Sequence, residues 1–120
     1  MELTQHILEH IDTLAAEQLE LLKTLAQIPA PSGKEERRAE FCRDWLHKNG
    51  ASDAYIDEAL NVILPIGVTD SSPVVVFAAH SDVVFPDTDP LPLHEEDGKL
   101  CCPGVGDDTA CVAALLMAAR

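Results

Sequence analysis

Apolar residues in the first quarter of the chain recur at three- and four-residue steps, the spacing of one buried helix face. Thr4 is a candidate N-cap for this helix. Pro29-Ala30-Pro31 would end it, because proline lacks an amide donor and disfavours helical backbone in the residue before it. The pattern predicts a helix from Thr4 to Ile28 whose inward positions are Ile7, Leu8, Ile11, Leu14, Ala15, Leu22 and Leu25.

A second helix is predicted directly after the prolines. Ser32 and Glu35 have the spacing of a capping box, with Ser32 as the N-cap. The helix is expected to run to about Lys48, with Gly50 as its C-terminal cap. Its inward positions are predicted to be Ala39, Cys42, Trp45 and Leu46.

The pattern then changes to short β-branched runs that predict strands at 54–57, 61–66 and 73–79. Pro65 predicts that the second is an edge strand or that the strand ends there, because a central strand would need the amide that proline lacks. The third run is apolar at every position from Val74 to Ala79, which is typical of a central strand covered on both faces.

Asp97-Gly98 is a turn signal and predicts a small hairpin between 93–96 and 99–102. The last segment, from Asp107 to Arg120, is helix-forming and contains no stop signal. We therefore interpret the 120 residues as a fragment that ends within a helix. The order of helices, strands and a final helix predicts an α/β organisation.

Composition narrows the class of protein. The chain is 47% hydrophobic, enough for the core of one domain, and its 8 basic and 21 acidic residues argue against nucleic acid or an anionic membrane as a partner. Its four cysteines form no C-x-x-C pair, which favours free thiols over a disulfide framework or a thiolate zinc site. No leader segment or run of roughly 20 apolar residues is present, so a cytoplasmic location is expected.

His80-Ser81-Asp82 follows the best core strand, at the end where open α/β sheets place ligands. Residues two apart in an extended chain point to the same side, so His80 and Asp82 can share one pocket. A carboxylate commonly orients a metal-binding histidine, although Asp82 could instead hold a separate catalytic residue. The alternative is a histidine that makes ordinary hydrogen bonds at a strand end.

Gly104-Val105-Gly106-Asp107-Asp108-Thr109 forms the second candidate motif, where the last helix begins. A carboxylate in such a turn can bridge two cations, one on each oxygen. The alternative is structural, with Asp107 as an N-cap and Asp108 as a first-turn acid that complements the helix dipole.

In order along the chain, these features resemble the M20 family of metallopeptidases. The resemblance rests on the segments 28–35, 61–62, 80–84, 97–100 and 104–109. It implies that residues 1–120 are the N-terminal portion of a three-layer α/β/α catalytic domain without the family's lid domain.

The resemblance also implies roles for single residues. His80 matches a zinc ligand, Asp107 matches the aspartate that bridges two zinc ions, and Asp82 matches a catalytic aspartate that supports a ligand or the base. It implies a cis peptide bond between Asp107 and Asp108. Cobalt or manganese could replace zinc. Val105 and Thr109 stand where family members often carry Arg and Lys, which points to a subgroup.

The implied activity is metal-dependent hydrolysis of a peptide or acyl-amino-acid amide bond. The family's Glu-Glu pair and remaining ligands are expected beyond Arg120, because Glu95-Glu96 precedes Asp107 and is in the wrong place. The 120 residues alone are therefore expected to lack peptidase activity and to bind zinc weakly. A non-catalytic α/β module that keeps the fold without a complete metal site is the alternative from another class. The oligomeric state is left open.

Overall fold

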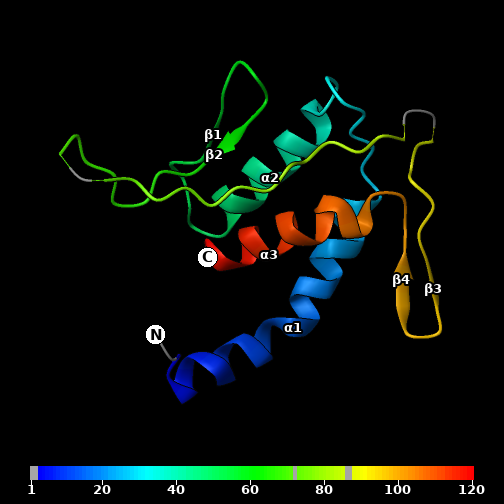
Figure 1. Ribbon diagram of the computed structural model, residues 1–120, viewed down its shortest axis with the longest axis horizontal. Coiled ribbons are helices and arrows are strands. Elements are labelled where there is room, and N and C mark those ends of the chain that lie inside the picture. The colour runs from blue at the N-terminus through cyan, green and yellow to red at the C-terminus, as the bar shows by residue number, and fades with distance from the viewer. Residues whose placement is uncertain (1–2, 72, 86–87) are drawn as a thin grey trace.

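The computed structural model describes residues 3–71, 73–85 and 88–120. Its helices are α1 (Gln5–Ala26), α2 (Glu36–Lys48) and α3 (Ala110–Ala118), and an irregular turn, η1 (Val105–Thr109), precedes α3. The strands are β1 (Tyr55–Ile56), β2 (Val62–Ile63), β3 (His94–Glu96) and β4 (Lys99–Cys101). Figure 1 shows α3 beside the C-terminal part of α1, with α2 on its other side. The α/β organisation predicted from sequence is present.

Helix α1 ends before the prolines, as predicted, but only its C-terminal half is buried. Leu21 and Leu25 are in the core, whereas Ile7, Leu8 and Ile11 are between 42% and 50% exposed. The N-terminal half of α1 projects away from the other elements (Figure 1). The prediction of one continuous buried face was therefore wrong for residues 5–11, which are exposed, whereas Leu14 packs against the core.

Helix α2 begins at Glu36, so the prediction of Ser32 as its N-cap was wrong. The Glu35 carboxylate accepts a hydrogen bond from the Gly33 amide, while the Ser32 hydroxyl donates to Asp82 instead. The end of α2 follows the prediction. Gly50 has φ +93°, its amide donates to the His47 carbonyl, and the Ala51 amide donates to the Leu46 carbonyl, which is a Schellman cap.

The predicted hairpin at Asp97-Gly98 is present, and the predicted strands near 54–57 and 61–66 also form a short antiparallel pair. Strand β1 pairs with β2, with Tyr55 opposite Ile63, and β3 pairs with β4, with His94 opposite Cys101. The β3–β4 turn contains Asp97 and Gly98 at φ +50° and +72°, as the sequence predicted. Each of these sheets has two strands within the described residues.

The segment 73–79 contradicts its prediction as a covered central strand. Within the described part of the chain it pairs with no other segment, and Val75, Val76 and Phe77 are each 77% exposed. A central strand exists only when neighbouring strands satisfy its backbone groups and side chains cover its faces. No described segment supplies those neighbours, so this run of the chain is extended but solvent-exposed (Figure 1).

The core lies where α1, α2 and α3 meet. Ala39, Cys42 and Leu46 of α2 are buried as predicted, and Trp45 is half-buried at its edge. The buried cluster consists of Leu21, Leu25, Cys42, Leu46, Ala54, Val112, Ala113, Leu116 and Met117. The four cysteines are free thiols, as expected. Among the described residues, no helix has the length and apolar character needed to cross a membrane.

Candidate metal centre

The segment 80–83 is held against the junction between α1 and α2. The Val83 amide donates to the Ala30 carbonyl over 2.8 Å, and Val83 forms an isolated parallel bridge with Pro31. The Val83 side chain is only 3% exposed. The backbone of His80 and Asp82 is thereby fixed at one end, although the residues before it are unpaired.

The turn η1 packs directly on Val83 and carries the second motif. Gly104 has φ +70°, and a Cβ atom at this position would lie 2.4 Å from Val83 Cγ1, so the close approach requires glycine. The Thr109 hydroxyl donates to the Gly104 carbonyl over 2.8 Å and closes the turn. The sequence of the loop therefore sets its distance from the 80–83 segment.

Asp107 and Asp108 do not occupy the positions that a purely structural role predicted. Both have non-helical backbone angles, and α3 begins at Ala110, so Asp107 is not the N-cap of that helix. The expected helix start at Asp107 was wrong by three residues. The peptide bond between Asp107 and Asp108 is cis, as the family resemblance implied.

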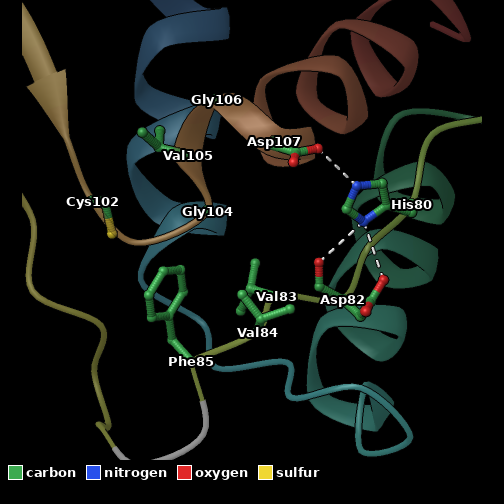
Figure 2. A pocket seen from close by; sticks show the side chains of 10 residues that line it. All are labelled: His80, Asp82, Val83, Val84, Phe85, Cys102, Gly104, Val105, Gly106 and Asp107. Carbon is green, nitrogen blue, oxygen red and sulfur yellow. Dashed lines mark hydrogen bonds and ion pairs between the residues drawn. The ribbon is translucent and has the colours of Figure 1, made fainter.

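The His80 imidazole lies between two carboxylates (Figure 2). Its Nε2 is 3.0 Å from Asp107 Oδ1, and its Nδ1 is 3.1 Å from both the carbonyl and Oδ1 of Asp82. The His80 amide also donates to Asp108 Oδ2 over 3.2 Å. Because a carbonyl oxygen only accepts, Nδ1 carries a proton, and Nε2 is the nitrogen that faces Asp107.

Asp82 is itself held from behind. The Ser32 hydroxyl donates to Asp82 Oδ2, and this hydrogen bond, together with His80, holds the pKa of the Asp82 carboxyl below its ordinary value. The hydrogen bond to Asp107, followed by those to Asp82, raises the pKa of His80. The order Ser32, Asp82, His80, Asp107 forms one hydrogen-bonded chain.

Arg38 of α2 contacts the segments that carry these site residues, and its side chain is fully buried. Its Nη1 donates to the Ser81 carbonyl at 2.9 Å and to the Thr109 hydroxyl at 3.2 Å. Its Nε and Nη2 both donate to the Ile28 carbonyl. Burial lowers the pKa of the Arg38 guanidinium from its ordinary value.

An open pocket of about 360 Å³ lies beside the imidazole. His80, Asp82 and Asp107 form its polar side, and the side chains of Val84 and Phe85 lie on the other side (Figure 2). The Asp107 side chain is 95% exposed, so its outer oxygen faces solvent. Within the described ranges, no group of three or more His, Cys, Asp or Glu side chains is placed to hold a metal ion.

The donors that are present suit zinc in chemistry and in spacing. Imidazole nitrogen and carboxylate oxygen are common zinc ligands, and two donors on one tetrahedral ion lie about 3.4 Å apart. The His80 Nε2 and Asp107 Oδ1 atoms are 3.0 Å apart. These two groups fit a partial site.

Other acidic and histidine residues lie elsewhere. Glu95 and Glu96 are exposed on β3, where Glu95 pairs with Lys23 over 2.6 Å, and neither lines the pocket. His6, His10 and His94 are exposed, and the His47 ring contacts the Ala54 carbonyl at 2.7 Å. Of these residues, the Glu95-Glu96 pair was expected to lie outside the site.

Sequence reasoning missed several contributors to the site. Ser32 was interpreted as a helix cap, because its spacing from Glu35 gives that signal. Asp108 was considered only as a helix-start acid, yet it accepts the His80 amide. For Arg38 the sequence contains no signal, since it is one of two adjacent arginines on a predicted helix.

Comparison with curated proteins shows similarity to hydrolases. The chain is 36% identical over 103 residues to a Pyrococcus abyssi protein provisionally named a LysW-lysine/LysW-ornithine hydrolase, covering 85% of this chain and 28% of that protein. A Pyrococcus furiosus protein with the same provisional name is 31% identical over 102 residues, covering 85% of this chain and 29% of that protein.

The LysW-lysine hydrolase of Deinococcus radiodurans is 41% identical over 66 residues, which cover 54% of this chain and 17% of that protein. The chain thus spans less than a third of the length of these relatives. No protein-family model matches the sequence. Likeness to hydrolases is therefore shown over one part of longer proteins.

Proposed function

We propose that the chain contributes part of a metal-dependent hydrolytic centre, with His80 and Asp107 as ligands and Asp82 as the group that orients His80. The three-layer α/β/α catalytic domain of the M20 metallopeptidases is the proposed context. The resemblance of the ordered motifs and the similarity to named hydrolases support this proposal.

The observation that carries the proposal is an imidazole with an oxygen atom facing each ring nitrogen. A neutral imidazole has one proton, and the Asp82 carbonyl requires that proton on Nδ1. A positive charge between Nε2 and the Asp107 carboxylate then satisfies both groups. A proton on Nε2 would do so, and a zinc ion has the donor preferences to take its place.

A zinc pair would supply a bound water of lowered pKa and polarise the amide carbonyl; cobalt or manganese could take its place. The residues of this chain would hold the cation and orient its histidine ligand. His80 and Asp107 would each direct a donor atom at the cation, and Asp82, fixed by Ser32, would keep the imidazole in the correct tautomer. The side chains of Val84 and Phe85 would provide an apolar surface beside the reacting bond.

The proposed substrate is an amide of the acyl-amino-acid or peptide type. The named relatives act on a lysine or ornithine unit joined to LysW, and a protein of their length that contains this chain would act on a bond of the same kind. The catalytic Glu and the other ligands would come from residues outside these 120, in a protein of the relatives' length. We therefore expect the purified 120-residue chain to hydrolyse no dipeptide at an ordinary enzymatic rate.

Metal titration of the 120-residue chain tests the ligand assignment. Co²⁺ binding would be followed by its visible absorption, and Zn²⁺ binding by competition with a chelator. We expect weak binding that His80→Asn or Asp107→Asn reduces at least about tenfold, because each change removes one of two donors. The matched controls are His94→Asn and Asp97→Asn, which alter the same residue types outside the pocket.

Equal binding by the wild type and by a His80→Asn, Asp107→Asn double variant would contradict the assignment. The alternative function is a non-catalytic α/β module that keeps the fold without a complete metal site. Zinc analysis of a protein of the relatives' length separates the two. A stoichiometric zinc content supports the hydrolase, and its absence supports the module.

A further inference from the structure

Arg38 is the one arginine of the adjacent pair 37–38 that is buried, and nothing in the proposed reaction uses it. Its side chain has no exposed surface, and no carboxylate within the described residues forms an ion pair with it. Its hydrogen bonds go to two backbone carbonyls and one hydroxyl. Burying a guanidinium whose hydrogen bonds all go to neutral groups costs desolvation free energy, which is a large cost for a small core.

The three partners of Arg38 lie on separate segments of the chain. Ile28 is in the junction after α1, Ser81 stands between His80 and Asp82, and Thr109 ends the turn that carries Asp107. The last two partners are 43 and 71 residues from Arg38 in sequence. One planar side chain therefore joins both halves of the candidate site to a common support.

The geometry of these contacts bears directly on the distance between His80 and Asp107. Arg38 Nη1 donates to both the Ser81 carbonyl and the Thr109 hydroxyl, so a single nitrogen fixes the backbone next to His80 relative to the η1 turn. Thr109 transmits this constraint, because its hydroxyl also donates to the Gly104 carbonyl. The rigid fork of arginine suits such a role better than the single ammonium of lysine.

We propose that Arg38 is a positioning residue that sets the separation of His80 from Asp107 by holding Ser81 and Thr109 on one guanidinium. A residue needed only for stability could be apolar at this position, since replacing buried charges by well-packed apolar side chains is often neutral or stabilising. The inference rests on the proposed metal site for its purpose, but the geometry it claims can be measured without metal.

The test compares Arg38→Lys and Arg38→Met with Arg37→Lys and Arg37→Met in the 120-residue chain. Arg37 is the matched control, because it is the adjacent arginine and its side chain is 61% exposed in a surface pair with Asp89. Three quantities are measured: the free energy of unfolding, the His80 ring resonances by NMR in metal-free protein, and the affinity for Co²⁺ alone.

We expect both Arg38 variants to shift the His80 ring resonances and to lower Co²⁺ affinity about ten- to hundredfold, the range seen for groups behind metal ligands. The Arg37 variants should leave both quantities unchanged. Folded Arg38 variants with wild-type His80 resonances would overturn the proposal, whatever their stability.

Thr109 provides a second pair of variants if the Arg38 variants fail to fold. Thr109→Val keeps the shape of this buried side chain and removes the hydroxyl, whereas Thr109→Ser keeps the hydroxyl. We expect Val to shift the His80 resonances and Ser to preserve them. Identical resonances in the two folded variants would contradict the role of Arg38.

The two proposals fail in different ways. If the wild-type chain binds no Co²⁺, the ligand assignment fails, while the His80 resonances still report whether Arg38 sets the distance to Asp107. If Co²⁺ binds and the Arg38 variants leave both readouts unchanged, the positioning role fails and the ligand assignment survives.

Discussion

Residues 73–79 and 80–83 are consecutive in sequence but differ in how firmly the rest of the protein holds them. The first segment is apolar, unpaired among the described residues and largely exposed. The second is polar at His80, Ser81 and Asp82, yet each of these residues is hydrogen-bonded to another part of the chain. Order in the candidate site therefore comes from hydrogen bonds to the α1–α2 junction and the η1 turn rather than from a sheet.

The contrast shows that apolar character alone does not bury a strand. Val83 is 3% exposed because Pro31 and the turn at Gly104 lie against it, while Val75 is 77% exposed. Burial stabilises a side chain by roughly 25 cal/mol per Å² only when another element covers it. Four predictions test this difference: three substitutions, from the largest expected change in the free energy of unfolding to the smallest, and one measurement of hydrogen exchange.

Gly104→Ala should have the largest effect, since it combines a positive φ with a close contact to Val83. Left-handed backbone costs a non-glycine residue about 1–2 kcal/mol, and overpacking adds about 1–3 kcal/mol. Gly98→Ala is the control, because its φ is +72° and its Cβ would meet no atom within 4 Å. Urea unfolding measures both, and equal losses would show that Val83 yields freely to the added methyl.

Val83→Ala should destabilise the chain by about 2 kcal/mol, because two buried carbons are lost at about 0.8 kcal/mol each together with a cavity cost. Val75→Ala makes the same chemical change at an exposed position and should stay within about 0.5 kcal/mol of wild type. The measurement is again the free energy of unfolding in urea. If Val75→Ala costs as much as Val83→Ala, the segment 73–79 is covered in solution.

Ser32→Ala should cost about 1 kcal/mol, the ordinary net value of one hydrogen bond, because the Asp82 carboxylate loses one of its two side-chain donors. The folded-state pKa of Asp82 is lowered, so this stability is present above the ordinary pKa of aspartate and is lost as the pH falls through the folded value. Stability of wild type and variant should therefore converge in acid. Ser52→Ala, at an exposed serine, should show no such convergence.

The least protection of amide hydrogens against exchange with solvent is expected in segment 73–79. Amide hydrogens of Val75 and Phe77 have no described backbone partner and should exchange at close to their intrinsic rates. The Val83 amide, which donates to Ala30, should be clearly slower. Hydrogen exchange followed by NMR measures both in one sample, and strong protection of Val75 would contradict the exposed conformation.

Much of the local structure was predictable because its causes are local. The prolines at 29 and 31 end α1, Gly50 ends α2, and Asp97-Gly98 forms the β3–β4 turn. The proximity of His80, Asp82 and Asp107 was also expected, because the order of motifs resembles that of the M20 family. Their roles as ligands and support are the part that metal binding must test.

The predictions from sequence that were wrong for Ser32 and for the start of α1 failed for a common physical reason. Ser32 satisfies the spacing rule for an N-cap, but its hydroxyl donates to Asp82, 50 residues away, instead of to the helix. Ile7, Leu8 and Ile11 have helical spacing, but no described element covers them. In both cases the local spacing is correct. Whether the side chain makes the expected contact depends on a segment far away in the sequence.

The sequence by itself determined where helices end, where the chain turns, and which residue types could hold a metal ion, since backbone restriction and ligand chemistry belong to single residues and their neighbours. Only the tertiary structure decided that Arg38 joins Ser81 to Thr109, that Gly104 must be glycine against Val83, and that the apolar segment 73–79 is uncovered. Each of these depends on contact between segments far apart in the chain, which no local pattern encodes.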